Sequence, residues 1–470
     1  MLNRHSNNFL KLYWLLGGLA VLSFLPSLWF YAVGEEGVYT IGAMEMWIRH
    51  DYLHQTTFGE FYNRPPMIVW AIGMVATLTG FKQIVLAARL VSLLSTLGMA
   101  FLTGILARLV INDRGFILFS SLITLTLGDL FFYRGWLAYA DPLLGFFTMA
   151  SITLMVFGLK YNSPFKLLLS GIFISAAFLT KSLTPFAIWY SALFVLSWDH
   201  KNKRLHYARG IWLIIPIPVL IAVIWFGVVN QHQQMGQSMM SDVIQKVFAS
   251  ESIVSYVKKI IIFPFNTALN LSPWVPLALV ILIIKRRINH PLIQRLSWLV
   301  IINLLPYWLA PQSHIRYLIS LYPLIGIVSA YIIWVNQDAL QPWIKRLLIT
   351  VVTLKCIFVL FLYPYYQSHF RGLNYTKVAQ DLLHTADNLP IYTTDGRSVG
   401  LNVVNEIDRV EYGKRFITIP PLDWQNAFLL SMTQTTNATL YQSLKITGDT
   451  IYVYCRGTAC QRPSHLNNNY

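Results

Sequence analysis

Two acidic positions in this chain of 470 residues stand directly beside long apolar segments. Glu35 and Glu36 follow the first apolar segment, and Asp141 precedes a later one. Carboxylates held beside a membrane can act as general bases or orient charged groups of a substrate. The local alternative is that Glu35-Glu36 interacts with the dipole of the next helix and that Asp141 caps a helix that starts with Pro142. Because the expected topology places both positions on one face, we favour chemistry and take Glu35, Glu36 and Asp141 as candidate catalytic residues.

Positively charged residues are expected on the same face. Arg64 precedes Pro65-Pro66, Lys181 interrupts two apolar segments, and His314 and Arg316 lie in a short turn between two others. Arg can hold a phosphate through its planar guanidinium and Lys through a point charge. Such cations stabilise a phosphate leaving group, whose negative charge grows as the bond breaks. The alternative is that these side chains snorkel toward lipid headgroups.

The composition indicates which solvent surrounds these residues. Hydrophobic residues make up 55% of the chain, charged residues 12% and aromatic residues 14%, and the mean hydropathy is +0.51. An average soluble domain has about 25% charged residues, so a cytosolic enzyme, a disordered chain and a disulfide-rich scaffold are excluded. The net charge of +16 comes from short clusters between apolar segments. This pattern is typical of the cytoplasmic loops of a polytopic membrane protein and argues against nucleic acid as a partner.

A bilayer core of about 30 Å requires about 20 apolar residues per helix, and we predict eleven spans. They lie near 9–33, 84–110, 116–137, 142–160, 166–180, 182–197, 209–229, 262–284, 295–310, 317–335 and 344–363. The segment 65–80 is short and opens with two prolines, so we place it in the membrane interface. With that choice the basic clusters between spans face the cytoplasm, as the positive-inside rule requires, and the N-terminus is expected inside.

The stretch after Glu36 has apolar residues at helical spacing, Val38, Ile41, Met44 and Ile48. This spacing predicts an amphipathic helix in the membrane interface. Its simplest role is an anchor, and it would hold Glu35 and Glu36 at the depth of lipid headgroups.

The residues from 364 onward form a different kind of polypeptide. Their charges are mixed, Asp395-Gly396 is a turn signal, and the alternation over 450–454 predicts a strand. We expect a membrane domain over 1–363, with juxtamembrane helices at about 35–80, and a small extracytoplasmic α+β domain over 364–470. Outside the cytosol, Cys455 and Cys460 could form a disulfide or remain two thiols.

Five motifs, in this order, resemble those of the C-type glycosyltransferases that use polyprenyl-phosphate sugars, the family of the lipid A aminoarabinose transferase and the dolichyl-phosphate-mannose protein mannosyltransferases. The motifs are Glu35-Glu36-Gly37-Val38-Tyr39, Tyr62-Asn63-Arg64-Pro65-Pro66, Ala138-Tyr139-Ala140-Asp141-Pro142, Thr180-Lys181-Ser182 and His314-Ile315-Arg316-Tyr317-Leu318. The resemblance extends over nearly the whole chain. It implies a polytopic α-helical membrane fold with a C-terminal periplasmic α+β domain.

The resemblance also implies roles for single residues. Glu35 would orient the acceptor and accept its proton, with Glu36 beside it, and Asp141 would orient the donor sugar or the cations next to it. Substrate and phosphate binding would fall to a second set of residues, namely Tyr39, Arg64, Lys181, His314, Arg316 and Tyr317.

The chain departs from the family pattern at three positions. Glu35 replaces an Asp, Arg64 replaces a Lys, and Asn63 stands where the relatives have a Glu that helps to hold a metal ion. No His partner is evident near 240–248. We therefore assign no cofactor and no metal ligand, with a divalent metal ion left as the open alternative.

Together these features predict an enzyme that moves a sugar from a polyprenyl-phosphate carrier to an envelope acceptor, lipid A or a related glycolipid. It would act at the outer face of a bacterial inner membrane, with the lipid-linked donor, a lipid or glycolipid acceptor and membrane lipids as partners. One alternative is a transporter or flippase of lipid-linked sugars, which would place its charges near the bilayer midplane. Another is an enzyme similar to an O-antigen ligase or polymerase.

Overall fold

The computed structural model describes residues 2–62, 64–199, 204–205, 214–229, 252–285, 288–336, 341–369, 375–394, 396, 398–435, 437–446, 448–468 and 470. The chain folds into two compact units, which are described separately. The first consists of Met1–Leu25, Ser92–Trp136 and Ala140–Cys356. The second consists of Pro26–Val91, Leu137–Tyr139 and Ile357–Tyr470. The second unit therefore contains the expected C-terminal domain together with the expected juxtamembrane helices.

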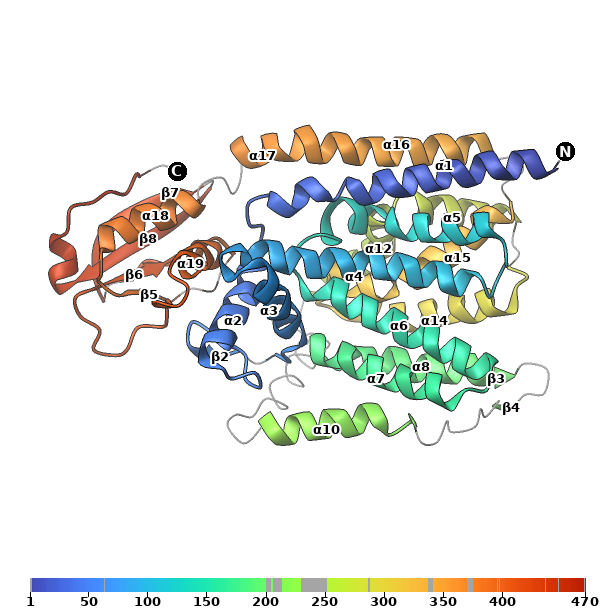
Figure 1. The fold of residues 1–470 in the computed structure, drawn as a ribbon, viewed down its shortest axis with the longest axis horizontal. Coiled ribbons are helices and arrows are strands. Elements are labelled where there is room, and N and C mark those ends of the chain that lie inside the picture. The colour runs from blue at the N-terminus through green and yellow to red at the C-terminus, as the bar shows by residue number, and fades with distance from the viewer. Residues whose placement is uncertain are drawn as a thin grey trace. The chain divides into compact units, whose positions relative to one another are not determined.

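The first unit is a bundle of apolar helices (Figure 1). Its elements are α1 (Leu2–Leu22), most of α4 (Ile84–Ala107), α5 (Arg114–Leu125), the π-helix η3 (Asp129–Arg134), α6 (Ala140–Lys160), α7 (Pro164–Thr180), α8 (Thr184–Ser197), the strand pair β3 (Trp198–Asp199) and β4 (Arg204–Leu205), α10 (Ile217–Val229), α12 (Ile253–Asn270), α13 (Trp274–Lys285), α14 (Pro291–Leu309), the 3-10 helix η4 (Ile315–Leu321), α15 (Tyr322–Trp334) and most of α16 (Gln341–Ile357).

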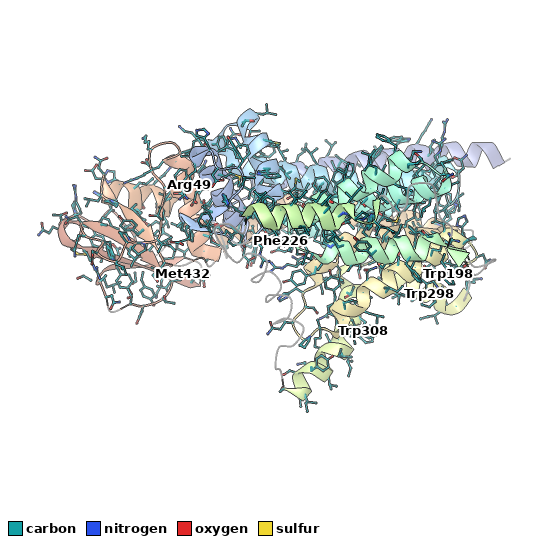
Figure 2. All side chains as sticks on the ribbon, turned by 90° about the horizontal axis from the view of Figure 1, so that it is seen from below. Arg49, Trp198, Phe226, Trp298, Trp308 and Met432 are labelled. Carbon is teal, nitrogen blue, oxygen red and sulfur yellow. A yellow bond between two sulfur atoms is a disulfide. The ribbon has the colours of Figure 1, made fainter. Side chains whose placement is uncertain are left out.

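Small residues and polar contacts hold these helices together, as expected where lipid removes the hydrophobic drive for helix association. The hydroxyl of Ser151 on α6 lies 2.7 Å from the carbonyl oxygen of Ser170 on α7. The indole of Trp189 on α8 donates to the Ser170 hydroxyl over 2.9 Å. On the outer surface, by contrast, large apolar side chains such as Trp298, 57% exposed, are suited to contact lipid (Figure 2).

Within the described residues, six helical stretches are long and apolar enough to cross a membrane: Leu10–Trp29, Phe81–Ala107, Ala140–Lys160, Pro291–Leu309, Ile315–Trp334 and Gln341–His369. Five shorter apolar helices are Met67–Thr79, Arg114–Leu125, Pro164–Thr180, Thr184–Ser197 and Ile217–Val229. Apart from Met67–Thr79, which lies in the segment that we placed at the interface, each overlaps one predicted span; Arg114–Leu125 covers only the first part of the predicted span 116–137. The helices are those of an integral membrane protein, while the number of eleven crossings remains a prediction.

The predicted span at 262–284 is wrong as a single helix. Helices α12 and α13 meet at an angle of 110°. The break occurs before Pro273, which cannot donate a backbone hydrogen bond and disfavours helical geometry in the preceding residue. Gly128 packs against this break, because a Cβ atom there would lie 2.8 Å from the carbonyl oxygens of Asn270 and Ser272.

The second unit combines short helices with one mixed sheet. Its elements are most of η1 (Leu25–Trp29), α2 (Glu36–Arg49), the strand pair β1 (Thr56–Thr57) and β2 (Glu60–Phe61), α3 (Met67–Thr79), η2 (Phe81–Gln83), the start of α4, the π-helix η6 (Phe358–Leu362), α17 (Tyr363–His369), α18 (Tyr375–Ala386), β5 (Ile391–Thr393), α19 (Ser398–Val410), β6 (Ala427–Ser431), β7 (Thr439–Ile446), β8 (Asp449–Arg456) and η7 (Gly457–Gln461). The strand order is β5-β6-β8-β7. Strands β5 and β6 are parallel, and the other neighbours are antiparallel.

Two sequence expectations correspond to elements of this unit. The amphipathic stretch after Glu36 is helix α2, and the alternating stretch 450–454 lies inside β8. The expected turn at Asp395-Gly396 includes Asp395, which lies outside the described residues.

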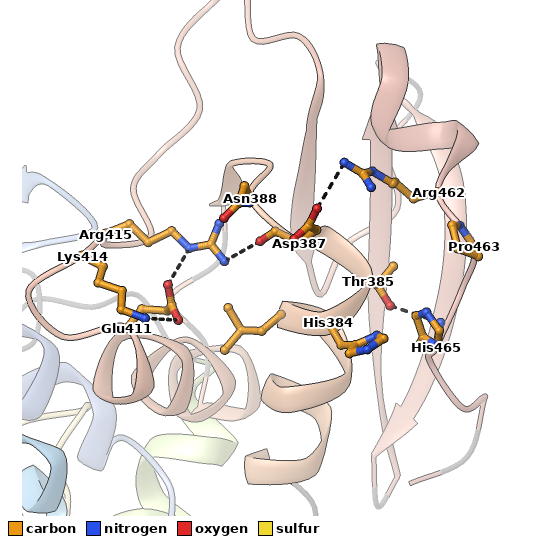
Figure 3. A pocket seen from close by; sticks show the side chains of 11 residues that line it. His384, Thr385, Asp387, Asn388, Glu411, Lys414, Arg415, Arg462, Pro463 and His465 are labelled. Atoms are coloured by element: carbon orange, nitrogen blue, oxygen red, sulfur yellow. Dashed lines mark hydrogen bonds and ion pairs between the residues drawn. The ribbon is translucent and has the colours of Figure 1, made fainter.

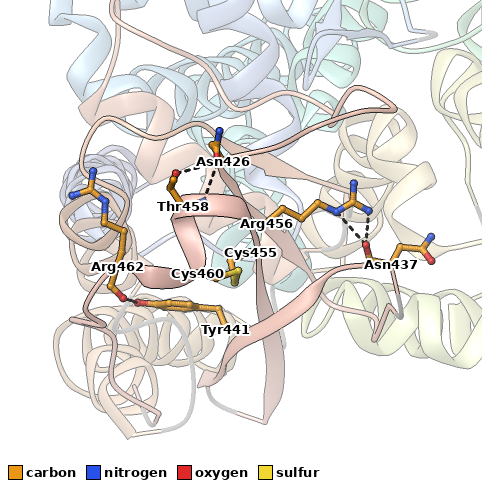
Figure 4. Close-up of a disulfide and its surroundings, with 8 residues drawn as sticks. All are labelled: Asn426, Asn437, Tyr441, Cys455, Arg456, Thr458, Cys460 and Arg462. Carbon is orange, nitrogen blue, oxygen red and sulfur yellow. Dashed lines mark hydrogen bonds between the residues drawn. A yellow bond between two sulfur atoms is a disulfide. The ribbon is translucent and has the colours of Figure 1, made fainter.

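A disulfide joins Cys455 at the end of β8 to Cys460 in η7 (Figure 4). Thr458 lies between the two cysteines in the sequence. Its backbone N–H (2.9 Å) and its hydroxyl (3.1 Å) donate hydrogen bonds to the side-chain oxygen of Asn426. Gly457 makes this turn possible because it has a φ of +59°, and a side chain there would overlap Asn426.

Candidate functional site

In the second unit, Glu36 begins helix α2 and is completely buried. Its Oε1 atom accepts hydrogen bonds from Arg89 Nε (3.0 Å) and the backbone N–H of Ala138 (2.8 Å). Its Oε2 atom accepts from Arg89 Nη2 and the backbone N–H of Val33, both at 2.7 Å. Both carboxylate oxygens are thus bound twice by groups of the protein itself.

Arg89 extends this network to the chain before α2. Its side chain is fully buried and donates to the carbonyl oxygens of Ser27 (3.1 Å), Phe30 (2.5 Å) and Tyr31 (2.9 Å). The pair of Glu36 and Arg89 therefore fixes the segment 27–33, the start of α2 and the backbone at Ala138. These contacts are those of a group that positions its neighbours.

Glu35 differs from its neighbour, because its side chain is exposed. Its backbone N–H donates to the phenol oxygen of Tyr139 over 3.1 Å. The residue before it, Gly34, has a φ of +59° and leaves no space for a side chain beside that phenol. The backbone around Glu35 is thus anchored while the residue is exposed. Tyr39, one turn further along α2, is half-buried.

Arg64 also belongs to the second unit, between strand β2 and helix α3. Its side chain is half-buried, and its backbone N–H donates to the carbonyl oxygen of Tyr62 over 2.7 Å. Asn63, the position where the relatives carry a Glu, lies outside the described residues.

In the first unit, Asp141 and Lys181 form an ion pair. Asp141 lies in the first turn of α6 and is 3% exposed. Lys181 lies in the break between α7 and α8, which Pro185 in the first turn of α8 helps to define. A buried carboxylate next to the ammonium group limits the positions that the lysine side chain can take.

The aromatic ring of Tyr317 gathers further cations around this pair. The Lys181 Nζ atom lies 5.0 Å from the ring centroid and the Arg316 Cζ atom 5.5 Å from it, distances at which a cation is attracted to the ring face. The His314 ring lies edge-on to the same ring, with 5.7 Å between centroids. The structure therefore brings five of the predicted residues together in the first unit, namely Asp141, Lys181, His314, Arg316 and Tyr317. The other four, Glu35, Glu36, Tyr39 and Arg64, belong to the second unit.

Two buried groups were not among the sequence candidates. One is Arg89, whose signal in the sequence is a lone charge inside an apolar segment. The other is Asp129, which Arg134 binds through Nε at 3.1 and 3.0 Å and to which the Tyr322 hydroxyl donates over 2.7 Å. Asp129 and Arg134 are the two ends of a π-helix, a conformation that often occurs at functional sites.

A pocket of about 440 Å³ in the second unit lies beside the end of α18 (Figure 3). Its arginines are engaged: Arg462 lies 3.5 Å from the Asp387 carboxylate, and Arg415 pairs with Glu411 at 3.3 Å. Arg415 also donates to the carbonyl oxygen of Leu389 at the end of this helix region. Predicted site residues do not line this pocket, and its ion pairs mainly hold the local fold.

Among the described side chains, no three His, Cys, Asp or Glu residues lie close enough together to hold a metal ion. Residues 240–248, where a His partner was sought, lie outside the described part of the chain.

Comparison with known proteins places the fold. No family model matches the sequence, and the search of curated proteins found no match. Among solved structures, ArnT from Cupriavidus metallidurans bound to undecaprenyl phosphate is similar, with a TM-score of 0.67 and 15% identity over 93% of this chain and 97% of that chain. The apo state of the same enzyme has a TM-score of 0.62 and 14% identity over the same shares of the two chains.

ArnT is the lipid A aminoarabinose transferase, a C-type glycosyltransferase. The chain therefore has the fold that the sequence motifs implied, that of a polytopic helical membrane protein with a sheet-containing C-terminal part.

Proposed function

We propose that this protein is a membrane glycosyltransferase that moves a sugar from a polyprenyl-phosphate carrier to a lipid or glycolipid acceptor, lipid A or a related glycolipid being the preferred class. The observation that carries the proposal is the likeness to ArnT, which extends over nearly the whole of both chains and includes a structure with undecaprenyl phosphate bound. The proposed location is the inner membrane of a bacterium, with the N-terminus in the cytoplasm and the C-terminal part in the periplasm. The distribution of basic clusters and the disulfide support this orientation.

The group around Tyr317 supports binding of the carrier phosphate. Lys181 and Arg316 carry the positive charges, and the buried Asp141 holds the Lys181 ammonium in place. In the proposed transfer, the bond between the sugar C1 and the carrier phosphate oxygen breaks. The phosphate leaves with the bonding electron pair, and the cations stabilise this charge. His314 and Tyr317 complete the phosphate-binding group.

In the second unit, the exposed carboxylate of Glu35 is the proposed general base. It accepts the proton of an acceptor hydroxyl while the acceptor oxygen forms its bond to C1, which inverts the anomeric centre. If the acceptor is a phosphate that is already ionised, Glu35 positions it. Glu36, with both oxygens bound by the protein, is a positioning residue. Tyr39 and Arg64 remain proposed substrate-binding residues.

The test uses the full-length protein in proteoliposomes with an undecaprenyl-phosphate sugar labelled in the sugar. We expect label in the acceptor lipid, and we expect mass spectrometry of envelope lipids to show one glycosylated species that disappears when the protein is absent. Movement of the labelled donor across the bilayer without transfer would instead identify a transporter. No transfer by wild-type protein to any phosphorylated or hydroxylated envelope lipid would overturn the proposal.

A further inference from the structure

A second cationic pocket lies in the first unit, with a volume of about 510 Å³. It lies between α12, the end of η3 and the turn before η4, and the described residues that line it include Arg134, Ser255, Lys258, Lys259, Asn266 and His314. Three of these are cationic and one is a histidine, and no acidic residue is among the described residues that line it. Guanidinium, ammonium, amide and hydroxyl donors around a space without carboxylates are suited to an anion such as a phosphate.

The side chain of Arg134, the arginine of this pocket, is fixed by an ion pair with Asp129. Arg134 Nε donates hydrogen bonds to both carboxylate oxygens of Asp129, at 3.0 and 3.1 Å. The same carboxylate accepts a hydrogen bond from the hydroxyl of Tyr322, a residue that is completely buried. A guanidinium fixed in this way is preorganised, so less rotamer entropy is lost when it binds an anion. The pocket is therefore built on a buried network rather than on mobile surface lysines alone.

The helix that carries the two lysines is fixed as well. The Lys259 ammonium donates to the carbonyl oxygens of Tyr307 (3.0 Å), Trp308 and Ala310 (2.6 Å) at the end of α14. In return, the indole of Trp308, labelled in Figure 2, donates to the carbonyl oxygen of Ile260 over 2.7 Å. Lys259 thus serves the fold by binding the negative end of a helix. Lys258, the residue before it on α12, lines the pocket and is exposed.

The surroundings indicate that the ligand is amphiphilic. Helix α12 exposes apolar side chains at helical spacing, Val254 (79%), Val257 (49%), Ile261 (59%) and Phe265 (69%). An exposed stripe of this kind on an amphipathic helix is expected to lie in the lipid interface. Ile262, Phe263 and Ile315 add apolar contacts to the pocket itself. An anion bound here would therefore be the headgroup of a lipid.

We propose that this pocket binds the phosphate-bearing headgroup of the acceptor lipid. The inference rests on the proposed function, in which Lys181, Arg316 and Tyr317 bind the carrier phosphate. His314 lines the pocket, while Arg316 and Tyr317, two and three residues further along, contact the Lys181 group. One turn of the first unit thus contributes to two anion-binding positions. A transferase that acts on two lipids needs both, and the acceptor is accordingly a phosphorylated lipid.

The test measures binding to the purified full-length protein in a neutral detergent. The probes are dioctanoyl phosphatidic acid, dioctanoyl phosphatidylcholine and undecaprenyl phosphate. We expect Lys258→Gln to weaken binding of phosphatidic acid by about tenfold, which corresponds to the loss of one charge-assisted hydrogen bond, and to leave undecaprenyl phosphate unaffected. Lys258→Arg should retain binding. Arg134→Lys should weaken binding of phosphatidic acid, and the lysine would still provide a cation beside Asp129. Lys285→Gln, at an exposed lysine at the end of α13, is the matched control and should bind as wild type does.

Two results would overturn the inference. One is equal binding of phosphatidic acid and phosphatidylcholine, which would mean that the pocket does not recognise a phosphomonoester. The other is a loss of undecaprenyl phosphate binding in Lys258→Gln as large as the loss of phosphatidic acid binding, which would assign the pocket to the carrier. The carrier site is tested separately by Lys181→Gln. Unchanged binding of undecaprenyl phosphate in that variant would count against the proposed function and leave the result for Lys258 standing.

Discussion

The guanidinium of Arg89 and the carboxylate of Glu36 form a bidentate ion pair, with Nη2 2.7 Å from Oε2 and Nε 3.0 Å from Oε1. Both side chains are fully buried, whereas the carboxylate of the preceding residue, Glu35, is exposed. Two adjacent glutamates thus have opposite environments. Their substitutions should therefore separate folding from activity.

Glu36→Gln should destabilise the second unit. The substitution leaves Arg89 as a buried charge without a carboxylate partner, and the loss of one partner of a buried ion pair costs about 3–5 kcal/mol. Thermal unfolding of the detergent-solubilised protein should show a clear decrease in the melting temperature. Glu60→Gln, at an exposed position in the same unit, is the control and should unfold as wild type does. A Glu36→Gln protein as stable as wild type would show that the pair does not hold the fold.

Glu35→Gln should have the opposite profile. If Glu35 is the general base for a hydroxyl acceptor, its removal should lower the transfer rate by about 10²- to 10⁴-fold. The melting temperature should fall far less than in Glu36→Gln, because the side chain is exposed and the hydrogen bond to Tyr139, which uses the backbone N–H, is retained. Glu35→Asp should retain part of the activity. Near wild-type turnover of Glu35→Gln in proteoliposomes would remove this role.

The sequence was sufficient to predict the helical fold, because apolar segments of bilayer length and the basic clusters between them are strong signals. It also identified Asp141, Lys181 and Tyr317, which lie far apart along the chain and which the structure brings together. The strand at 450–454 could be predicted because alternation with a period of two residues is specific to strands.

Other features could not be predicted from local patterns. Pro273 marks a possible break in the predicted span 262–284, but the size of the bend, 110°, could not be predicted from it, nor could the close approach of Gly128 to the carbonyl oxygens of Asn270 and Ser272. The difference between Glu35 and Glu36 depends on Arg89, which lies 53 residues after Glu36 in the sequence. The pairing of Arg134 with Asp129 could not be predicted either, because the π-helix that brings the two residues together has no sequence signature.

Asp141→Asn should separate binding from chemistry. The change removes the negative charge that pairs with Lys181, so the carrier phosphate should bind at least as tightly as in wild type. The ammonium, however, loses the group that fixes its position, and misplacement of a catalytic group by about 1 Å can cost about 10²-fold in rate. We therefore expect kcat to decrease strongly while the Kd for undecaprenyl phosphate is unchanged or lower. A higher Kd with an unchanged kcat would contradict the role of Asp141 in positioning Lys181.

The second unit should lose stability as the pH rises. Asp408 is completely buried and accepts the backbone N–H of Ile417 over 2.9 Å. Burial raises the pKa of this carboxyl well above its usual value, and the nearby charge of Glu45 raises it further. Burial also raises the pKa of Glu45. Because the pKa in the folded state exceeds that of the unfolded chain, the stabilising contribution is complete below about pH 4 and is lost as the pH rises through the folded-state pKa.

Asp408→Asn should remove most of this dependence. The amide can still accept the Ile417 N–H, and it has no charge to bury at pH 8. We expect the melting temperature of the variant at pH 8 to exceed that of wild type by about 2–4 °C for each kcal/mol gained, with little difference between the two proteins at pH 4. Asp423→Asn, at an exposed position in the same unit, should behave as wild type at both pH values. A wild-type melting temperature that rises between pH 4 and pH 8, with no gain from Asp408→Asn, would contradict the burial argument.

Reduction of the disulfide should weaken the C-terminal sheet. The bond between Cys455 and Cys460 closes a loop with a sequence separation of 5 and ties the end of β8 to η7. By the chain-entropy estimate, closing so short a loop stabilises the folded state by about 2 kcal/mol. The double variant Cys455→Ser/Cys460→Ser should unfold at a lower temperature than wild type, and dithiothreitol should lower the wild-type melting temperature to the same value. Cys356→Ser, which removes the free thiol on α16, is the control: it should melt as wild type does and keep the sensitivity to dithiothreitol. If dithiothreitol leaves wild type unchanged while free-thiol labelling shows that the bond is reduced, the disulfide does not stabilise this unit.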